Sequence, residues 1–486
     1  MKTAIRVLAL AYFVALSSTF ALITPVGRGF DEDHHLDYVS YVARTGAIPN
    51  QYIEDESIEY EGHQPPLYYF LAAACLRLLG ASDAAANFHF LRFMSVLLAT
   101  FNLALVFRMS AWFPLNGFWQ LAPGLLVATL PQFGFVSGMV SNDSLANLLA
   151  TAAICSLLAI HAEPLRWAEY LRFGCWLGLG ILTKKTIMFL IPGAAIVVGY
   201  ALWQVHGKQG RILLRALGAM AVCVILSGWW FVRNHQLYGE WLGTTMEARS
   251  MHFIFYPKPL WSPYFIGRFS DVRLARLLFF ETLVAFPALV PFCVGVLIVF
   301  VAGLLDRLYA WHANRRPLMP AGIVIAAPAF VFIALSLCFV CGWYSSGDFF
   351  WQLYLSAFCH LASYDLELPF GLYLAYGCVL LASLIGLVQY MWRERLRDMR
   401  TVLAVTWVSM CFAGIVYYNT MYNQAQGRFL FPVLSLIAVL VALGLQTLLT
   451  NRQRWVQTAS VTAIVGIAML GEGVAVAMAY AHYAAS

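Results

Sequence analysis

Carboxylate and imidazole side chains are concentrated directly after the first apolar segment of the chain. The stretch GFDEDHHLDYVSYVARTGAIPN places Asp31, Glu32 and His34 close together, and YEGHQPPLYYFL adds Glu61 and His63 a few residues later. Such side chains can transfer protons, and they can also bind a divalent metal. Their spacing matches no recognised metal-ligand pattern, so we favour proton transfer and keep Glu61 and His63 as the candidate metal ligands.

Asp31 opens a predicted amphipathic helix over residues 31–45, and two interpretations of its carboxylate stand side by side. It can cap the helix, with the neighbouring acids forming a solvated face. Alternatively, it is a general base held at the start of the helix, with Glu32, His34 and His35 shaping the electrostatic field around it. The sequence alone does not decide between these two roles.

A second carboxylate and four basic residues lie at the predicted outer ends of later helices. Asp143, in SGMVSNDSLANLL, can cap its own helix, or it can meet Asp31 if both lie on one face of the membrane. Each basic residue can simply anchor a helix end, but four cations in one layer favour an anionic ligand such as a lipid phosphate. These basic residues are Lys184, Lys185, Arg233 and Arg428.

The composition is that of a polytopic membrane protein. The chain is 61% hydrophobic and 11% charged, with a mean hydropathy of +0.73. We predict an all-α fold of about thirteen transmembrane helices with outer juxtamembrane helices. No connection is long enough for a separate soluble domain, so residues 1–486 form a single membrane domain. The predicted spans are residues 5–24, 89–107, 117–137, 144–161, 172–183, 186–203, 213–231, 280–304, 319–341, 369–390, 401–418, 429–448 and 457–478.

Positive charge along the chain sets the predicted topology. The basic connections HAEPLRWAEYLR, VHGKQGRILLR, DRLYAWHANRRP, MWRERLRDMR and TNRQRW all face the cytoplasm only if residues 66–79 do not span the membrane. We therefore predict a first extracytoplasmic loop over residues 25–88 and a second over residues 232–279, both made of juxtamembrane helices. The first apolar run is long for a signal peptide, so we favour an uncleaved first helix.

The chain offers no place for a soluble nucleotide-linked donor. No cytoplasmic connection can hold a nucleotide-binding fold, and no phosphate-cradling glycine loop is present. The net charge of +6 is explained by topology rather than by a nucleic acid partner. Any donor must therefore arrive from the membrane, and a polyprenyl-phosphate sugar meets this constraint.

Several segments resemble the GT-C superfamily of membrane glycosyltransferases, in the branch that contains the protein O-mannosyltransferases and the bacterial lipid A aminoarabinose transferases. The similar segments are DEDHHLDYVSYVARTGAIP, HQPPLYYFLAAA, LPQFGFVSGMVSND, GLGILTKKTIMFLIP and QGRFLFPVL. The likeness is specific over about residues 5–200 and looser beyond them. HQPPLYY, WWFVRNHQLYG and QGRFLFP are most similar to a prokaryotic subgroup, which implies a prokaryotic cytoplasmic membrane.

The resemblance also implies roles for single residues. In such families the first acidic residue after helix one is the catalytic carboxylate, which corresponds to Asp31. The acidic residue that opens the fourth span corresponds to Asp143, so we predict both as catalytic residues. The basic residue after the fifth span binds the carrier phosphate and corresponds to Lys184 or Lys185.

One departure from the aminoarabinose transferases lies just before the paired prolines. Those enzymes have an acidic and a basic residue where this chain has His63 and Gln64. The sugar, and the metal and lipid contacts of this loop, therefore stay open. We expect Glu61, His63 and Gln64 to bind the sugar or the acceptor, together with Glu32 and His34.

The residues and the resemblance together predict an integral membrane glycosyltransferase. It would move a sugar from a polyprenyl-phosphate donor to a glycan, lipid or protein acceptor by an inverting single displacement on the extracytoplasmic face. The competing hypothesis is a transporter or flippase of lipid-linked sugars, which predicts ionisable residues deep inside spans and matching sites on both faces. The clustering of polar residues on one side favours the enzyme, and a purely structural scaffold leaves the Asp31 cluster unexplained.

Overall fold

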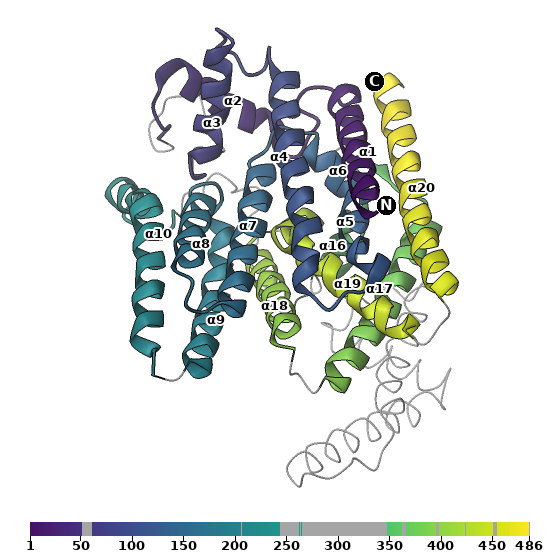
Figure 1. The fold of residues 1–486 in the computed structure, drawn as a ribbon. Coiled ribbons are helices and arrows are strands. Elements are labelled where there is room, and N and C mark those ends of the chain that lie inside the picture. Colours follow the sequence, from purple (N-terminus) through teal and green to yellow (C-terminus); the bar gives the residue numbers. More distant parts are fainter. Residues whose placement is uncertain are drawn as a thin grey trace.

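The protein is a bundle of α-helices in a computed structural model (Figure 1). The structure describes residues 1–50, 61–205, 207–243, 262, 264, 348–361, 366–394, 398–422, 424–450 and 454–485. The predicted spans 280–304 and 319–341 lie outside the described residues, as does most of the predicted second outer loop.

The described chain is almost entirely helical. Its α-helices are α1 (Lys2–Ile23), α2 (Glu32–Thr45), α3 (Leu67–Leu78), α4 (Phe88–Met109), α5 (Ala122–Ala128), α6 (Pro131–Ser137), α7 (Asp143–Ala162), α8 (Trp167–Ile181), α9 (Leu190–Gln204), α10 (Gln209–Tyr238), α16 (Asp348–Phe358), α17 (Phe370–Arg393), α18 (Met399–Asn419), α19 (Leu434–Leu449) and α20 (Arg454–Ala485). Short 3-10 helices are η1 (Ser110–Trp112), η2 (Gly117–Gln120), η3 (Lys185–Phe189) and η6 (Gly427–Val433). Strands β1 (His360–Leu361) and β2 (Leu366–Glu367) form one antiparallel pair, in which His360 faces Glu367 and Leu361 faces Leu366.

The all-α membrane fold predicted from the sequence is confirmed. Within the described ranges, nine helices are long and apolar enough to cross a bilayer. The predicted span 117–137 is wrong as a single helix, because it divides into α5 and α6. Pro131, which lacks a backbone N–H, starts α6 and ends the continuity of the run. The predicted span 172–183 falls in α8, which has 15 residues.

Helices α2 and α3 lie together at one end of the bundle. Figure 1 shows them at the upper edge, while the C-terminal ends of α9 and α17 and the N-terminal ends of α10 and α18 lie at the opposite, lower end of the labelled helices. The 12 residues of α3 extend about 18 Å, which is too short to cross a bilayer. Arg77 on α3 donates to the carbonyl oxygens of Ala43 (2.8 Å) and Val42 (3.1 Å), so it satisfies the C-terminal end of α2. Arg77, the basic residue inside this apolar segment, therefore holds α3 against the end of α2.

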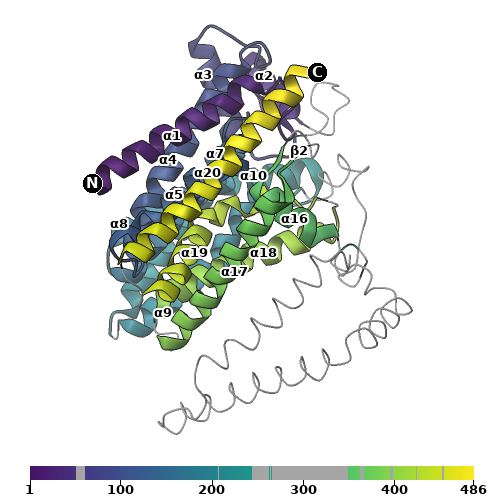
Figure 2. The same cartoon turned by 90° about the vertical axis from the view of Figure 1, so that its right-hand side faces the viewer.

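The first and last described helices run side by side, as both Figure 1 and Figure 2 show. The Tyr12 hydroxyl on α1 donates to a carboxylate oxygen of Glu472 on α20. Glu472 is fully buried, so this hydrogen bond satisfies one oxygen of a carboxyl group that has left water. The contact ties the helix that leads into Asp31 to the far end of the chain.

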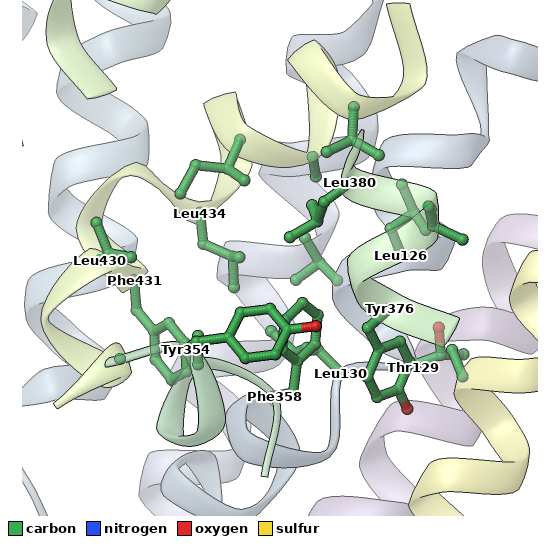
Figure 3. Close-up of a pocket in the computed structure, with 18 of the residues that line it drawn as sticks. Leu126, Thr129, Leu130, Tyr354, Phe358, Tyr376, Leu380, Leu430, Phe431 and Leu434 are labelled. Atoms are coloured by element: carbon green, nitrogen blue, oxygen red, sulfur yellow. The ribbon is translucent and has the colours of Figure 1, made fainter. Parts of the chain in front are cut away.

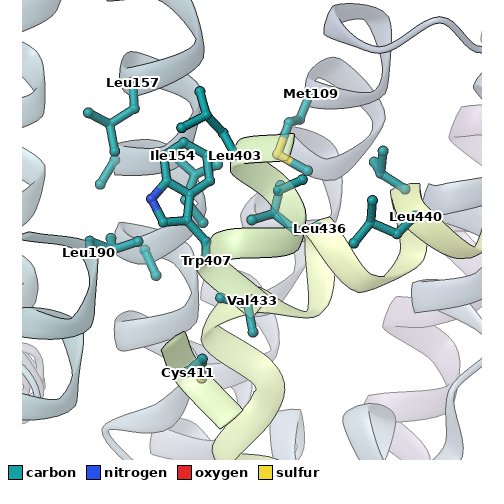
Figure 4. Packing of buried hydrophobic residues seen from close by; sticks show 14 of the residues in the cluster. Met109, Ile154, Leu157, Leu190, Leu403, Trp407, Cys411, Val433, Leu436 and Leu440 are labelled. Atoms are coloured by element: carbon teal, nitrogen blue, oxygen red, sulfur yellow. The ribbon is translucent and has the colours of Figure 1, made fainter. Parts of the chain in front are cut away.

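A buried indole organises the packing around α18. Trp407 is 0% exposed and packs among Ile154 and Leu157 of α7 and Leu190 of α9 (Figure 4). Gly193 on α9 makes room for it, because a Cβ there would lie 1.5 Å from the indole nitrogen. This interlock holds α18 against α7 and α9, and those helices lead into the polar cavity described below.

Helices α17 and α19 cross at two glycines. A Cβ on Gly386 would lie 1.9 Å from the carbonyl oxygen of Gly444, and a Cβ on Gly444 would lie 1.9 Å from that of Ser383. Small residues at a membrane helix crossing let the two backbones approach closely. Neither position can accept a side chain unless the helices move apart.

We expect Gly444→Ala to lower the thermal unfolding midpoint of the detergent-solubilised protein. The added methyl group forces α17 and α19 apart, at a cost of about 1–3 kcal/mol. Gly466→Ala on α20 is the matched control, because nothing lies within 4 Å of a Cβ there. Equal midpoints for the two variants would contradict the packing described for this crossing.

Candidate active site

A fully buried ion pair fixes the start of α2. Arg92 on α4 donates through Nε to Glu32 Oε1 (2.8 Å) and through Nη2 to Oε2 (2.5 Å), and both side chains are 0% exposed. Arg92 also donates to the carbonyl oxygens at the end of α1, those of Ala21, Thr24 and Pro25. Oε1 of Glu32 accepts a further bond from the Val140 backbone (2.9 Å). Four segments therefore meet at one bidentate pair.

This pair corrects the substrate-binding role predicted for Glu32. Both of its oxygens are engaged inside the protein, and Glu32 does not line the polar cavity. Arg92 is not among the site residues predicted from the sequence, because it lies inside the predicted span 89–107. An arginine within an apolar run is an indication in itself, since such a charge needs a buried partner.

The preceding residue, Asp31, has an unusual backbone. Its φ of 56° and ψ of 18° place it in the left-handed region, and it is the one non-glycine residue with positive φ in the described chain. Its side chain makes no capping bond to α2. Instead Oδ2 accepts a hydrogen bond of 2.6 Å from Arg428 Nη2. The structure thus decides against the helix-capping interpretation. The strained backbone conformation directs the carboxylate toward Arg428 instead of toward the start of α2.

Arg428 joins the two carboxylates that the sequence singled out. Its Nη1 lies 3.4 Å from Oδ2 of Asp143, while its Nη2 holds Asp31. Lys184 donates to the other oxygen of Asp143. The result is a chain of alternating charges, Asp31, Arg428, Asp143 and Lys184, in which two carboxylates balance two cations.

The side chain of Arg428 is also held by contacts other than the two carboxylates. Its Nε donates to the side-chain oxygen of Gln426, and its guanidinium carbon lies 4.8 Å from the ring centroid of Phe30. Phe429 lies on another side, 5.5 Å away. Arg428 is only 5% exposed, so these contacts fix the guanidinium without help from solvent.

These charged groups line a cavity of about 440 Å³. Its lining contains both polar and apolar side chains, so the cavity is amphipathic. The polar part is formed by Asp31, His35, Glu61, Gln64, Asn142, Asp143, Lys184, Lys185, Thr186, Gln424 and Arg428. The apolar and aromatic part is formed by Met188, Phe189, Leu242, Cys411, Gly414, Ile415, Tyr417, Tyr418, Phe429 and Pro432.

His35, one helical turn after Asp31, faces the cavity. Its Nδ1 lies 2.9 Å from the Tyr69 hydroxyl, and Tyr69 stacks on Tyr38 with ring centroids 3.7 Å apart. Burial lowers the pKa of His35 to about 3, although Asp31 and Asp143 act in the opposite direction. The imidazole is therefore neutral at physiological pH and serves as a hydrogen-bonding group.

Asp31 is ionised under the same conditions. Burial is the largest single influence and opposes its charge, but the paired Arg428 guanidinium and the weaker contributions of His35 and Lys184 together hold the pKa of the carboxyl below its ordinary value. Beside it, the Asn142 amide donates to Gln64 Oε1 (3.4 Å) and to the Thr183 carbonyl (3.3 Å). Asn142 was not predicted as a site residue, although it directly precedes Asp143.

Three predicted site residues besides Glu32 do not line the cavity. His34 is half-buried on α2, and His63 is buried with its Nε2 3.4 Å from Gln64 Nε2. Arg233 on α10 donates to the Pro49 carbonyl (2.8 Å) and lies over the Trp230 ring. The predicted layer of four cations is thereby reduced to Lys184, Lys185 and Arg428 at the cavity.

The candidate metal ligands Glu61 and His63 are 3% and 4% exposed. Within the described residues, no group of three or more histidine, cysteine, aspartate or glutamate side chains could hold a metal ion. A set of two protein ligands does not make a closed metal centre. We therefore assign no metal-dependent step to this pair.

A second cavity of about 320 Å³ lies on the other side of η6 and is lined almost entirely by apolar side chains (Figure 3). Gly427, Leu430 and Phe431 of η6 face this apolar cavity, whereas Arg428 and Phe429 face the polar one. The short helix η6 is thus the wall between them. In a 3-10 helix residues three apart share a side, as Gly427 and Leu430 do toward the apolar cavity and Phe429 and Pro432 do toward the polar one.

Comparison with known proteins finds one matching family model and several structures of similar fold. Residues 63–230 match the family model described as dolichyl-phosphate-mannose-protein mannosyltransferase. No curated protein matches the chain. The apo structure of the Archaeoglobus fulgidus oligosaccharyltransferase is similar with a TM-score of 0.56 and 14% identity, over 98% of this chain and 56% of that one. The chain thus spans about half the length of that protein, and the likeness shows a shared fold.

Two further structures are similar at lower TM-scores. ArnT from Cupriavidus metallidurans bound to undecaprenyl phosphate has a TM-score of 0.41 and 14% identity, over 91% of this chain and 78% of that one. A protein O-mannosyltransferase complex of S. cerevisiae, Pmt1-Pmt2 bound to the sugar donor, has a TM-score of 0.38 and 16% identity, over 52% of this chain and 36% of that one.

The resemblance to GT-C membrane glycosyltransferases that the sequence motifs carry is confirmed by the matched family model and the shared fold. The matched range 63–230 includes Asp143 and Lys184 but neither Asp31 nor Arg428. Those two residues belong to the site through the structure, which brings them together across 397 positions of sequence.

The buried pair predicts a strong stability effect. Arg92→Ala leaves the Glu32 carboxylate buried without its partner, so we expect a loss of about 3–5 kcal/mol of folding free energy. Arg44→Ala on the exposed face of α2 is the control and should change stability little. Thermal unfolding in detergent measures both variants, and a stable Arg92→Ala protein would show that the pair is dispensable.

Proposed function

We propose that this protein is a membrane glycosyltransferase that transfers a sugar from a polyprenyl-phosphate donor to an acceptor hydroxyl. The observation that carries the proposal is the convergence of Asp31, Asp143, Lys184 and Arg428 in the lining of one amphipathic cavity. A general base and a phosphate-binding pair of cations stand side by side there. These are the parts that transfer of a sugar from a lipid phosphate requires.

The two kinds of lining residue suit the two parts of such a donor. Lys184, Lys185 and Arg428 can bind a phosphate group. The apolar lining, which includes Met188, Phe189 and residues of α18, suits the first isoprenoid units. The volume of about 440 Å³ falls within the range of small-molecule sites, about 300–1,000 Å³.

The proposed reaction is a single displacement at the anomeric carbon. Asp31 accepts the proton of the acceptor hydroxyl while the acceptor oxygen forms a bond to that carbon. The bond between the anomeric carbon and the phosphate oxygen breaks, and the polyprenyl phosphate leaves with the electron pair. Arg428 and the lysines stabilise the charge that develops on the leaving oxygen. Attack opposite the leaving group inverts the anomeric centre.

The remaining polar residues position these groups. Asp143 holds both Lys184 and Arg428, so it sets the spacing of the phosphate-binding cations. Neutral His35 faces the cavity beside Asp31 and can bind a hydroxyl of the sugar or of the acceptor. Glu61 and Gln64 line the same wall and have the same kind of role.

We place the reaction on the extracytoplasmic face of a prokaryotic cytoplasmic membrane. The support is the distribution of charge: basic residues flank the facing ends of α9 and α10 and of α17 and α18, and these ends lie opposite to α2 and α3 in the bundle (Figure 1). The cavity is built from the starts of α2 and α7 and from η3 and η6, and it includes Gln64 directly before α3. Its charged groups gather at one end of the bundle, and this asymmetry favours an enzyme over a flippase.

The test of this function is transfer from a panel of radiolabelled polyprenyl-phosphate sugars in membranes that carry the protein. We expect Asp31→Asn to lower the transfer rate by about 10²–10⁴-fold, because the general base is lost. Asp33→Asn is the matched control, since Asp33 is an exposed acid in the same first turn of α2. Full activity of Asp31→Asn at equal expression would remove Asp31 from the chemical step.

The protonation states of Asp31 and His35 predict that kcat/KM does not change with pH on the acid side of neutrality. The pKa of Asp31 is held below its ordinary value, and that of His35 is about 3, so neither group changes charge as pH falls from about 8 to about 5. Since kcat/KM reports the free enzyme, loss of the base form should begin only near or below pH 4. An acid limb near pH 6.5 that disappears in His35→Gln would contradict these assignments.

A further inference from the structure

The cations that would bind the donor phosphate are already paired with carboxylates. Arg428 holds Asp31 at 2.6 Å and lies 3.4 Å from Asp143, and Lys184 holds Asp143 as well. A carboxylate that receives a charge-assisted bond from a guanidinium is a poor proton acceptor, because the bond stabilises its ionised form. The same Arg428 is therefore needed by the base and by the donor.

We propose that the donor phosphate replaces Asp31 as the partner of Arg428, so that donor binding itself frees the carboxylate that accepts the proton. This inference rests on the proposed function, and it adds the order of events. The base is held inactive until the phosphate is bound. When the donor is bound, Asp31 is released from Arg428 and can accept the proton. When the site is empty, Asp31 stays paired with Arg428.

The geometry allows this exchange without movement of the arginine. Nε is held by Gln426, and the guanidinium plane is flanked by Phe30 and Phe429, so the side chain is anchored independently of Asp31. Nη2 can then change its acceptor from a carboxylate oxygen to a phosphate oxygen. A carboxylate oxygen and a phosphate oxygen both accept a charge-assisted hydrogen bond from a guanidinium.

The accessibility of the two carboxylates identifies which one is displaced. The Asp31 side chain is 30% exposed, whereas that of Asp143 is 7% exposed. Asp143 also keeps Lys184 as a second partner, while Arg428 is the one basic residue that pairs with Asp31 in the described chain. A ligand that enters the cavity therefore meets the Asp31 contact first and leaves the Asp143 contacts in place.

Exchange of partners predicts an unusual effect on affinity. If Asp31 competes with phosphate for Arg428, removal of the carboxylate should tighten binding of the phosphate. We expect Asp31→Asn to bind a short-chain polyprenyl phosphate, without a sugar, about tenfold more tightly than the wild-type protein, since one charge-assisted bond no longer has to be broken. Binding is measured in detergent micelles by titration calorimetry.

Two further variants complete the experiment. Asp31→Gly also removes the carboxylate and suits the positive φ at this position, so it serves if Asp31→Asn folds poorly. Asp33→Asn should leave the affinity unchanged. Weaker or unchanged binding in both Asp31 variants, with clear binding to the wild type, would overturn the exchange and leave the proposed function standing. Failure of the wild type to bind polyprenyl phosphate would overturn both.

Discussion

The bidentate pair between Arg92 and Glu32 is the interaction on which the site depends. It is fully buried, and it joins the end of α1, the start of α2, the first turns of α4 and the turn before α7. Buried charges persist only when they are paired and hydrogen-bonded, so each of these segments has one allowed position. Asp31 directly precedes Glu32, and Asp143 follows Val140 by three residues. One ion pair therefore places both carboxylates of the cavity.

A second constraint is the neutrality of the charged chain from Asp31 to Lys184. Two carboxylates and two cations in a half-buried cavity satisfy one another, which makes the charged groups tolerable away from bulk water. An incoming anion disturbs this balance and must take over a cation from a carboxylate. The stability of the empty site and the activation of the base are thus two consequences of the same pairing.

The apolar framework serves these polar groups. Trp407 fixes α18 against α7 and α9, and the glycine crossing of α17 and α19 brings α19 close enough for η6 to form a wall between two cavities. Arg428 projects from this wall toward Asp31. The archaeal oligosaccharyltransferase shares the fold at 14% identity, so the packing that makes such a bundle does not require a similar sequence.

The sequence by itself determined the class of the protein. Apolar runs, charge asymmetry and the short proline-led segment at 66–79 identified an all-α membrane protein with α2 and α3 at one end, because hydropathy and length are local properties. The same pattern singled out Asp31, Asp143, Lys184 and Arg428. It erred at 117–137, where Pro131 divides the run, since hydropathy does not register a backbone break.

Tertiary structure alone decided which polar residues act together. Glu32 and Asp31 are neighbours of the same chemical type, yet one is a buried structural partner of Arg92 and the other faces the cavity. His35 rather than His34 faces the cavity, because one helical position turns a side chain by about 100°. The pairing of Asp31 with Arg428 joins residues 397 positions apart. Such contacts depend on how helices pack, and no local pattern in the sequence encodes that.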